Sequence, residues 1–77
     1  MQNNLLTVNV QDEYTLRTVE VNSGAIKTIR HCGGKIVQGP IITDDKVTIT
    51  VLEPSGNKVG KIYQLPQLSL YKTFVAS

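Results

Sequence analysis

The sequence is poor in the residues that most often carry chemistry. Its 77 residues include one cysteine, one histidine, one phenylalanine and no tryptophan. A single cysteine excludes a disulfide within the chain, and a lone thiol is typical of a reducing compartment. Cys32 and its neighbour His31 do not suggest a nucleophile and its base, because adjacent side chains point in different directions on a strand or a helix. We therefore expect no catalytic residues and predict that Cys32 is a small buried hydrophobic residue.

Long apolar runs and clusters of metal ligands are also missing. Polar or charged residues interrupt every apolar stretch well before the ~20 residues that a membrane helix requires. Zinc needs three or four ligands, and beyond His31 and Cys32 there are only scattered carboxylates such as Asp44 and Asp45. The segment 1–6 has neither the basic nor the apolar region of a secretory signal. We expect a cytoplasmic protein with no membrane association, metal, cofactor or enzymatic activity.

The residues that are present indicate a small β-rich domain. A chain of 77 residues has room for one core, so residues 1–77 are expected to form a single domain with a narrow margin of stability. Hydrophobic and polar residues alternate over 5–10 and 46–51, which is the period of a half-buried strand. The predicted fold class is mainly β, a small barrel or sandwich-like arrangement of five to seven short strands in antiparallel hairpins.

Two hairpins are predicted from turn residues. The first joins 5–10 to 14–21, and the second joins 46–51 to 58–65 across Pro54-Ser55-Gly56-Asn57. The register of the second stays open. A two-residue loop sets Ile49 opposite Ile62, whereas a three-residue loop sets Val51 opposite Val59.

The strand 14–21 changes phase within its length. Val19 and Val21 are out of step with Leu16, because side chains on a strand alternate between two faces. A bulge near Arg17 or Thr18 would reconcile them. The alternative is that both valines cover a second, smaller cluster or a contact surface.

The segment 24–32 can be interpreted either as a short helix or as a strand. Ser23 and Gly33 are typical of the two ends of a short helix, whereas the branched Ile26 and Ile29 favour a strand. The boundary signals favour at most one short helix over 24–32. With that helix the element order resembles the β-grasp fold, an α+β alternative. The resemblance is in element order only and implies no conjugation, because the chain lacks the terminal Gly-Gly of ubiquitin.

The remaining elements are less regular. Pro40 is expected at a sheet edge or a bend, because proline cannot donate to a ladder. Asp44-Asp45 reads as a turn. The apolar tail 67–75 fits either a strand or a short helix, and it is expected to be docked. The predicted core consists of Leu6, Val8, Leu16, Ile29, Val37, Val47, Ile49, Val51, Ile62 and Leu70.

The charges are distributed in blocks. Residues 1–20 and 44–53 each carry a net charge of −2, whereas 21–43 and 54–77 each carry +3, for a total of +2. If the basic blocks fold side by side, they form a face that attracts phosphate or an acidic protein surface. The candidate partner-binding residues are Arg17, Lys27, Arg30, Lys35, Lys58, Lys61, Tyr63, Tyr71 and Lys72.

These observations favour binding over catalysis. The expected function is protein–protein interaction, as an adaptor, inhibitor or accessory protein, through an uncovered sheet edge or through self-association into a homodimer or a larger oligomer. The alternative is a small β-barrel that binds nucleic acid with a basic face and tyrosines. The size, the lone thiol and the absence of any known motif are similar to those of small accessory proteins that bacteriophages encode.

Overall fold

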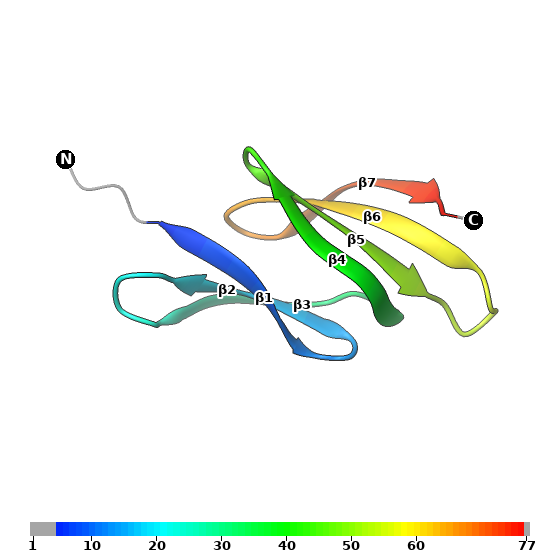
Figure 1. The fold of residues 1–77 in the computed structure, drawn as a ribbon, viewed down its shortest axis with the longest axis horizontal. Coiled ribbons are helices and arrows are strands. Elements are labelled where there is room, and N and C mark those ends of the chain that lie inside the picture. The colour runs from blue at the N-terminus through cyan, green and yellow to red at the C-terminus, as the bar shows by residue number, and fades with distance from the viewer. Residues whose placement is uncertain (1–4, 77) are drawn as a thin grey trace.

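Every regular element of residues 5–76, which the computed structural model describes, is a β-strand (Figure 1). The strands are β1 (Leu6–Asp12), β2 (Thr15–Glu20), β3 (Ile26–His31), β4 (Lys35–Thr43), β5 (Lys46–Leu52), β6 (Lys58–Gln64) and β7 (Ser69–Val75). They pair antiparallel in two sheets, with the orders β1-β2-β3 and β4-β5-β6-β7. The expected mainly β fold of antiparallel hairpins is confirmed. The described residues contain no helix long and apolar enough to cross a membrane.

The expected helix over 24–32 is wrong, and with it the β-grasp alternative. Residues 26–31 form β3, which pairs with β2 from Thr15↔His31 to Val19↔Ile26. The signals that suggested a helix start serve a turn instead, because Ser23 Oγ accepts from the Ala25 N–H at 3.2 Å. The β-branched residues of this segment decide its conformation once β2 offers a strand to pair with. Residues 1–4, part of the segment examined for a secretory signal, lie outside the described residues.

The first hairpin is confirmed, but its irregularity differs from the expected one. The ladder between β1 and β2 runs without interruption from Leu6↔Glu20 to Val10↔Leu16. A register shift between Thr18 and Val19 occurs only against β3, where Lys27 is the extra residue. Val19 therefore stays on the sheet face opposite Leu16, which we call the outer face of the three-stranded sheet.

The second hairpin is also confirmed, with the register of the longer loop. Val51 pairs with Val59, so Ile49 lies opposite Lys61 rather than Ile62. Asp44 and Asp45 form the turn between β4 and β5, as expected. Pro40 lies in β4, an edge strand of its sheet, where the missing N–H is tolerated.

The tail is a strand. Residues 69–75 form β7, which pairs with β6 from Val59↔Val75 to Gln64↔Ser69 and carries one extra residue, Tyr71. The backbone is docked as expected, yet all seven residues of β7 are exposed. β7 is thus an edge strand, and none of its side chains is among the core residues.

One apolar cluster lies between the two sheets. Its buried members are Val8, Leu16, Cys32, Val47, Ile49, Val51, Tyr63 and Leu68. The predictions for Val8, Leu16, Val47, Ile49 and Val51 are confirmed, as is the interpretation of Cys32, which is 1% exposed. Leu6 and Ile62 are half-buried. Tyr63 and Leu68 were not predicted as core.

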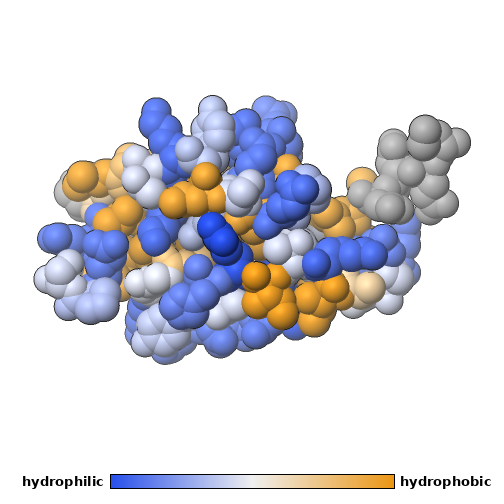
Figure 2. All heavy atoms as spheres, turned by 180° about the vertical axis from the view of Figure 1, so that it is seen from behind, coloured by the Kyte–Doolittle hydropathy of each residue, from blue (hydrophilic) through white to orange (hydrophobic). Residues whose placement is uncertain are grey.

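Three predicted core residues are exposed instead, namely Ile29, Val37 and Leu70. Ile29 pairs with Arg17 and therefore shares its face rather than that of Leu16. Val37 is the extra residue where the register of β4 shifts, and Leu70 lies beside the irregularity in β7. All three are on edge strands, which an opposing sheet covers least. Figure 2 shows the result on one side of the molecule, where hydrophobic atoms reach the surface in separate patches among hydrophilic ones.

Gly39 and Gly56 share a backbone conformation that favours glycine but differ in the space available to a side chain. Gly39 and Gly56 both have a positive φ, of 90° and 94°. A Cβ on Gly39 would lie 2.7 Å from the Thr48 carbonyl oxygen, whereas one on Gly56 would meet nothing within 4 Å. We predict that Gly56→Ala lowers the free energy of unfolding by about 1–2 kcal/mol. Gly39→Ala should lower the free energy of unfolding by ~1–3 kcal/mol more than Gly56→Ala does, because its Cβ would also collide with the backbone of β5. Urea titrations of both variants measure the difference, and equal losses would contradict the packing of β4 on β5.

Candidate partner-binding surface

The four-stranded sheet has one face that no other sheet covers. Residues directly opposite each other in an antiparallel pair share a face, so the registers of β4 to β7 assign each side chain. One face carries Val47, Ile49 and Val51 and packs in the core. We call the other the outer face. It consists of Lys35, Gln38, Ile41, Thr43, Lys46, Thr48, Thr50, Leu52, Lys58, Gly60, Ile62, Gln64, Ser69, Tyr71, Lys72 and Phe74.

The outer face is positively charged. It holds Lys35, Lys46, Lys58 and Lys72, and the strands β4 to β7 contain no aspartate or glutamate. The nearest carboxylates lie in turns, at Asp44, Asp45 and Glu53, or in the other half of the chain. Four of the nine predicted partner-binding residues lie here, namely Lys35, Lys58, Tyr71 and Lys72. Lys46 belongs with them and was not predicted, because its sequence block has a net negative charge.

Two aromatic rings lie on the outer face. Phe74 is opposite Gly60, and its ring occupies the space above that residue, since a Cβ there would overlap the ring. The ring of Tyr71 lies 4.7 Å from Lys46 Nζ. Phe74 is 43% and Tyr71 58% exposed, so both rings are open to solvent. The face therefore combines cations with accessible aromatic surface.

Lys46 is held in place by the turn that precedes it. Asp45 accepts hydrogen bonds from Gln64 Nε2 at 2.7 Å and from Lys46 Nζ at 3.2 Å. The hydrogen bond from Gln64, followed by that from Lys46, lowers the pKa of the Asp45 carboxyl below its usual value. The ionised carboxylate is thus favoured in the folded state.

The other predicted binding residues are spread over the molecule. Arg17 lies on the outer face of the three-stranded sheet, with its Nε donating to Asn9 Oδ1 at 2.7 Å. Lys27 Nζ lies 3.9 Å from Glu20 on the neighbouring strand. Arg30 extends over the ring of Tyr63, at 5.9 Å from its centroid. The two basic blocks therefore do not form one face.

Lys61 and Tyr63 lie on the inner side. Lys61 is opposite Ile49, and its Nζ donates to the Cys32 carbonyl oxygen at 2.6 Å. Tyr63 is 2% exposed, and burial, followed by a hydrogen bond with Cys32, raises the pKa of its hydroxyl far above the usual value. Both residues join β6 to the segment where the chain crosses between sheets. Lys61 pairs with Ile49 and Tyr63 pairs with Val47. Only the correct hairpin register could therefore have placed both residues on the inner side.

The side chains of His31 and Cys32 lie in different environments. The His31 ring stacks on Tyr14 at 6.2 Å, and its Nδ1 accepts a hydrogen bond from the Gly33 N–H at 3.1 Å. Cys32 points into the core on the opposite side. No group of three or more histidine, cysteine or acidic side chains within residues 5–76 is placed to hold a metal ion.

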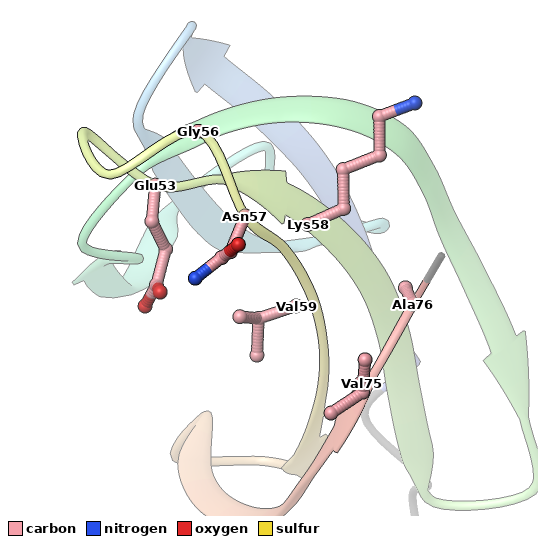
Figure 3. A pocket seen from close by; sticks show the side chains of 7 residues that line it. All are labelled: Glu53, Gly56, Asn57, Lys58, Val59, Val75 and Ala76. Atoms are coloured by element: carbon pink, nitrogen blue, oxygen red, sulfur yellow. The ribbon is translucent and has the colours of Figure 1, made fainter.

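A hollow of about 530 Å³ lies where the turn between β5 and β6 meets the end of β7 (Figure 3). Val59 and Val75 line it from two neighbouring strands, and Glu53 and Asn57 line it from the turn. Val59 pairs with Val75, and Val75 is 86% exposed. On the strand side the hollow is therefore lined by the apolar Val59 and Val75 and by Lys58, and it is open beside the free edge of β7.

Lys61 stabilises the fold, whereas the exposed Lys58 on the same strand does not. We predict that Lys61→Met lowers the free energy of unfolding by about 1.5–3 kcal/mol, because it removes a charge-assisted hydrogen bond to a carbonyl at the sheet crossing. Lys58→Met is the matched control on the same strand, and its exposed side chain should change stability by less than about 0.5 kcal/mol. Urea unfolding measures both. Similar values for the two variants would contradict a structural role of Lys61.

The shifted pKa of Asp45 predicts a pH dependence. A group with a lowered pKa in the folded state stabilises the fold above its unfolded pKa of about 3.9, and this contribution is lost as the pH falls through the folded pKa. Stability should therefore fall on acidification below about pH 4, and Asp45→Asn should fall less steeply. Thermal midpoints by circular dichroism between about pH 2 and pH 6 test this. Parallel curves for both proteins would contradict the assignment.

No protein-family model, curated protein or solved structure matches this chain.

Proposed function

We propose that this chain is a non-enzymatic binding protein that acts through protein–protein interaction, by accepting an extended segment of a partner beside β7. The observation that carries the proposal is that β7 is an edge strand whose seven residues are all exposed. An uncovered edge is a template for a further strand, and such strand addition is a common mode of peptide recognition.

The backbone of β7 is oriented for this role. The Ala76 N–H donates to the Lys58 carbonyl oxygen at 3.1 Å, and hydrogen-bonded and non-hydrogen-bonded pairs alternate along an antiparallel ladder. The backbone groups of Phe74 and Lys72 therefore point toward β6. Those of Thr73 and Val75 point away from β6, toward the position of an added strand.

Side chains beside this edge supply specificity. The hollow lined by Val59 and Val75 lies on one face, and Phe74 and Lys72 lie on the other. Because the side chains of an added strand alternate between faces, an apolar residue would enter the hollow and its neighbours would meet the lysine-rich outer face. A partner segment that alternates apolar and acidic residues fits both requirements.

The other edges are less suitable. β1 is buried or half-buried over residues 6–9. The ladder of β4 with β5 has two register shifts, and β4 contains Pro40. Both features hinder the pairing of a further strand with this edge. β3 carries the irregularity at Lys27. Residues 72–75 of β7 form an uninterrupted stretch of the ladder, and Phe74 and Val75 expose apolar side chains there. The setting that fits this proposal is a cytoplasmic accessory protein, encoded by a bacteriophage, whose partner is another protein or a second copy of the chain.

Thr73→Pro tests the edge. The substitution removes an N–H that points away from β6, so the ladder between β6 and β7 keeps its hydrogen bonds. The added strand loses one hydrogen bond and collides with the proline ring. We predict that partner binding falls more than about tenfold, whereas Thr73→Val, which keeps the N–H, binds normally. Capture from nuclease-treated lysate measures partner binding, and light scattering measures self-association.

Equal urea midpoints for the two variants control for folding. Partner capture or self-association that is unchanged by Thr73→Pro, or a capture that disappears with nuclease, would contradict the proposal.

A further inference from the structure

We propose that the outer face of the four-stranded sheet binds single-stranded nucleic acid. This second site shares Phe74 and Lys72 with the surroundings of the β7 edge, but it uses side chains of four strands rather than the free backbone of one. Three observations support it: the sign of the charge, the accessible rings and the order in which the two alternate.

The charges on this face are suited to phosphate. No ion pair within residues 5–76 involves Lys58 or Lys72. Lys35 lies 3.8 Å from Glu13, with both side chains at least half exposed, and such a pair is weak. Lys46 is shared between Asp45 and Tyr71. Two lysines are thus fully available, and two more can exchange a weak partner for a phosphate.

The rings are suited to bases. Phe74 covers Gly60 and Tyr71 is the extra residue of β7, so each exposes a flat aromatic surface on the same face. Base stacking on such rings is tolerant of sequence and requires unpaired bases. A double helix hides those surfaces, and the face is therefore matched to a single strand.

Cations and rings alternate on the outer face. The register places Lys58, Phe74 and Lys72 in successive rows of the pleat, about 7 Å apart. The ring of Tyr71, the extra residue next to Lys72, lies 4.7 Å from Lys46 Nζ on β5. A single strand needs this alternation, because phosphates and bases recur together along it. An acidic polypeptide would use the lysines and leave the rings without a role.

The experiment measures fluorescence anisotropy of a labelled oligothymidylate with the full chain. For single strands the slope of log K against log salt is about −0.7 per phosphate contacted, so two to four contacts predict a slope between about −1.4 and −2.8. Lys58→Gln and Lys72→Gln should each reduce its magnitude by about 0.7. Lys27→Gln, on the three-stranded sheet, is the matched control and should leave the slope unchanged.

The rings are tested separately. Phe74→Leu keeps an apolar cover on Gly60 but loses the stacking surface, and we expect at least about fivefold weaker binding, with Phe74→Tyr restoring it. Tyr71→Leu should weaken binding similarly, which provides a second test if Phe74→Leu unfolds. Thr73→Pro should not affect the oligonucleotide, so failure here is distinguishable from failure at the β7 edge.

Several results would overturn the inference. They are the absence of binding at about 50 mM salt, a slope that Lys58→Gln and Lys72→Gln do not change, and affinity indifferent to both rings. Equal affinity for a duplex, or displacement by polyglutamate as effective as by unlabelled oligonucleotide, would also do so, and the latter would assign the face to an acidic protein.

Discussion

Residues 32–34 carry the chain from one sheet to the other, and the polar groups of this crossing are satisfied by both sheets. The Cys32 N–H donates to Tyr14, next to β2, and the Cys32 carbonyl accepts from Lys61 on β6. Gly34 follows, where a Cβ would lie 2.8 Å from the Leu52 carbonyl oxygen. Buried backbone groups are costly when unpaired, so this short segment fixes how the sheets face each other. The core forms around it, since the Cys32 side chain is one of its members.

The sheets differ in width, and this explains where the surface is available. Three strands face four, so β7 receives little cover, and the sheet face turned away from the core receives none. Most exposed large hydrophobic residues lie on the edge strands β3, β4 and β7, at the turns, or on the outer faces. A chain of this size cannot bury all of its apolar side chains. The uncovered remainder is what gives the two proposed binding sites their apolar component.

The strands were predictable where residues alternate regularly, and the core was predictable in the same places. Val47, Ile49 and Val51 required only the period of two. The strand β3 was not predictable, because Ser23 and Gly33 at its ends are as typical of turns as of helix caps. Its conformation depends on pairing with β2. Leu68 could not be placed in the core from its neighbours, since it occupies a turn with a positive φ of 57°.

The candidate site was predicted less well for the same reason. Net charge by sequence block does not say which face a side chain occupies, and one residue of register separates the outer face from the core. Lys61 and Lys58 come from one basic block, yet the first stabilises the sheet crossing and the second faces outward. Lys46 was overlooked because its neighbours in sequence are acidic. In space it lies beside Tyr71 and Gln64 as well as Asp45.

The single thiol has a practical consequence. Cys32 is buried against Tyr63 between the sheets, so a thiol reagent can reach it only after the sheets separate. The rate of its modification under native conditions therefore reports the frequency of that opening, without any residue being substituted. Any ligand that holds the sheets together would slow this reaction in proportion to its occupancy.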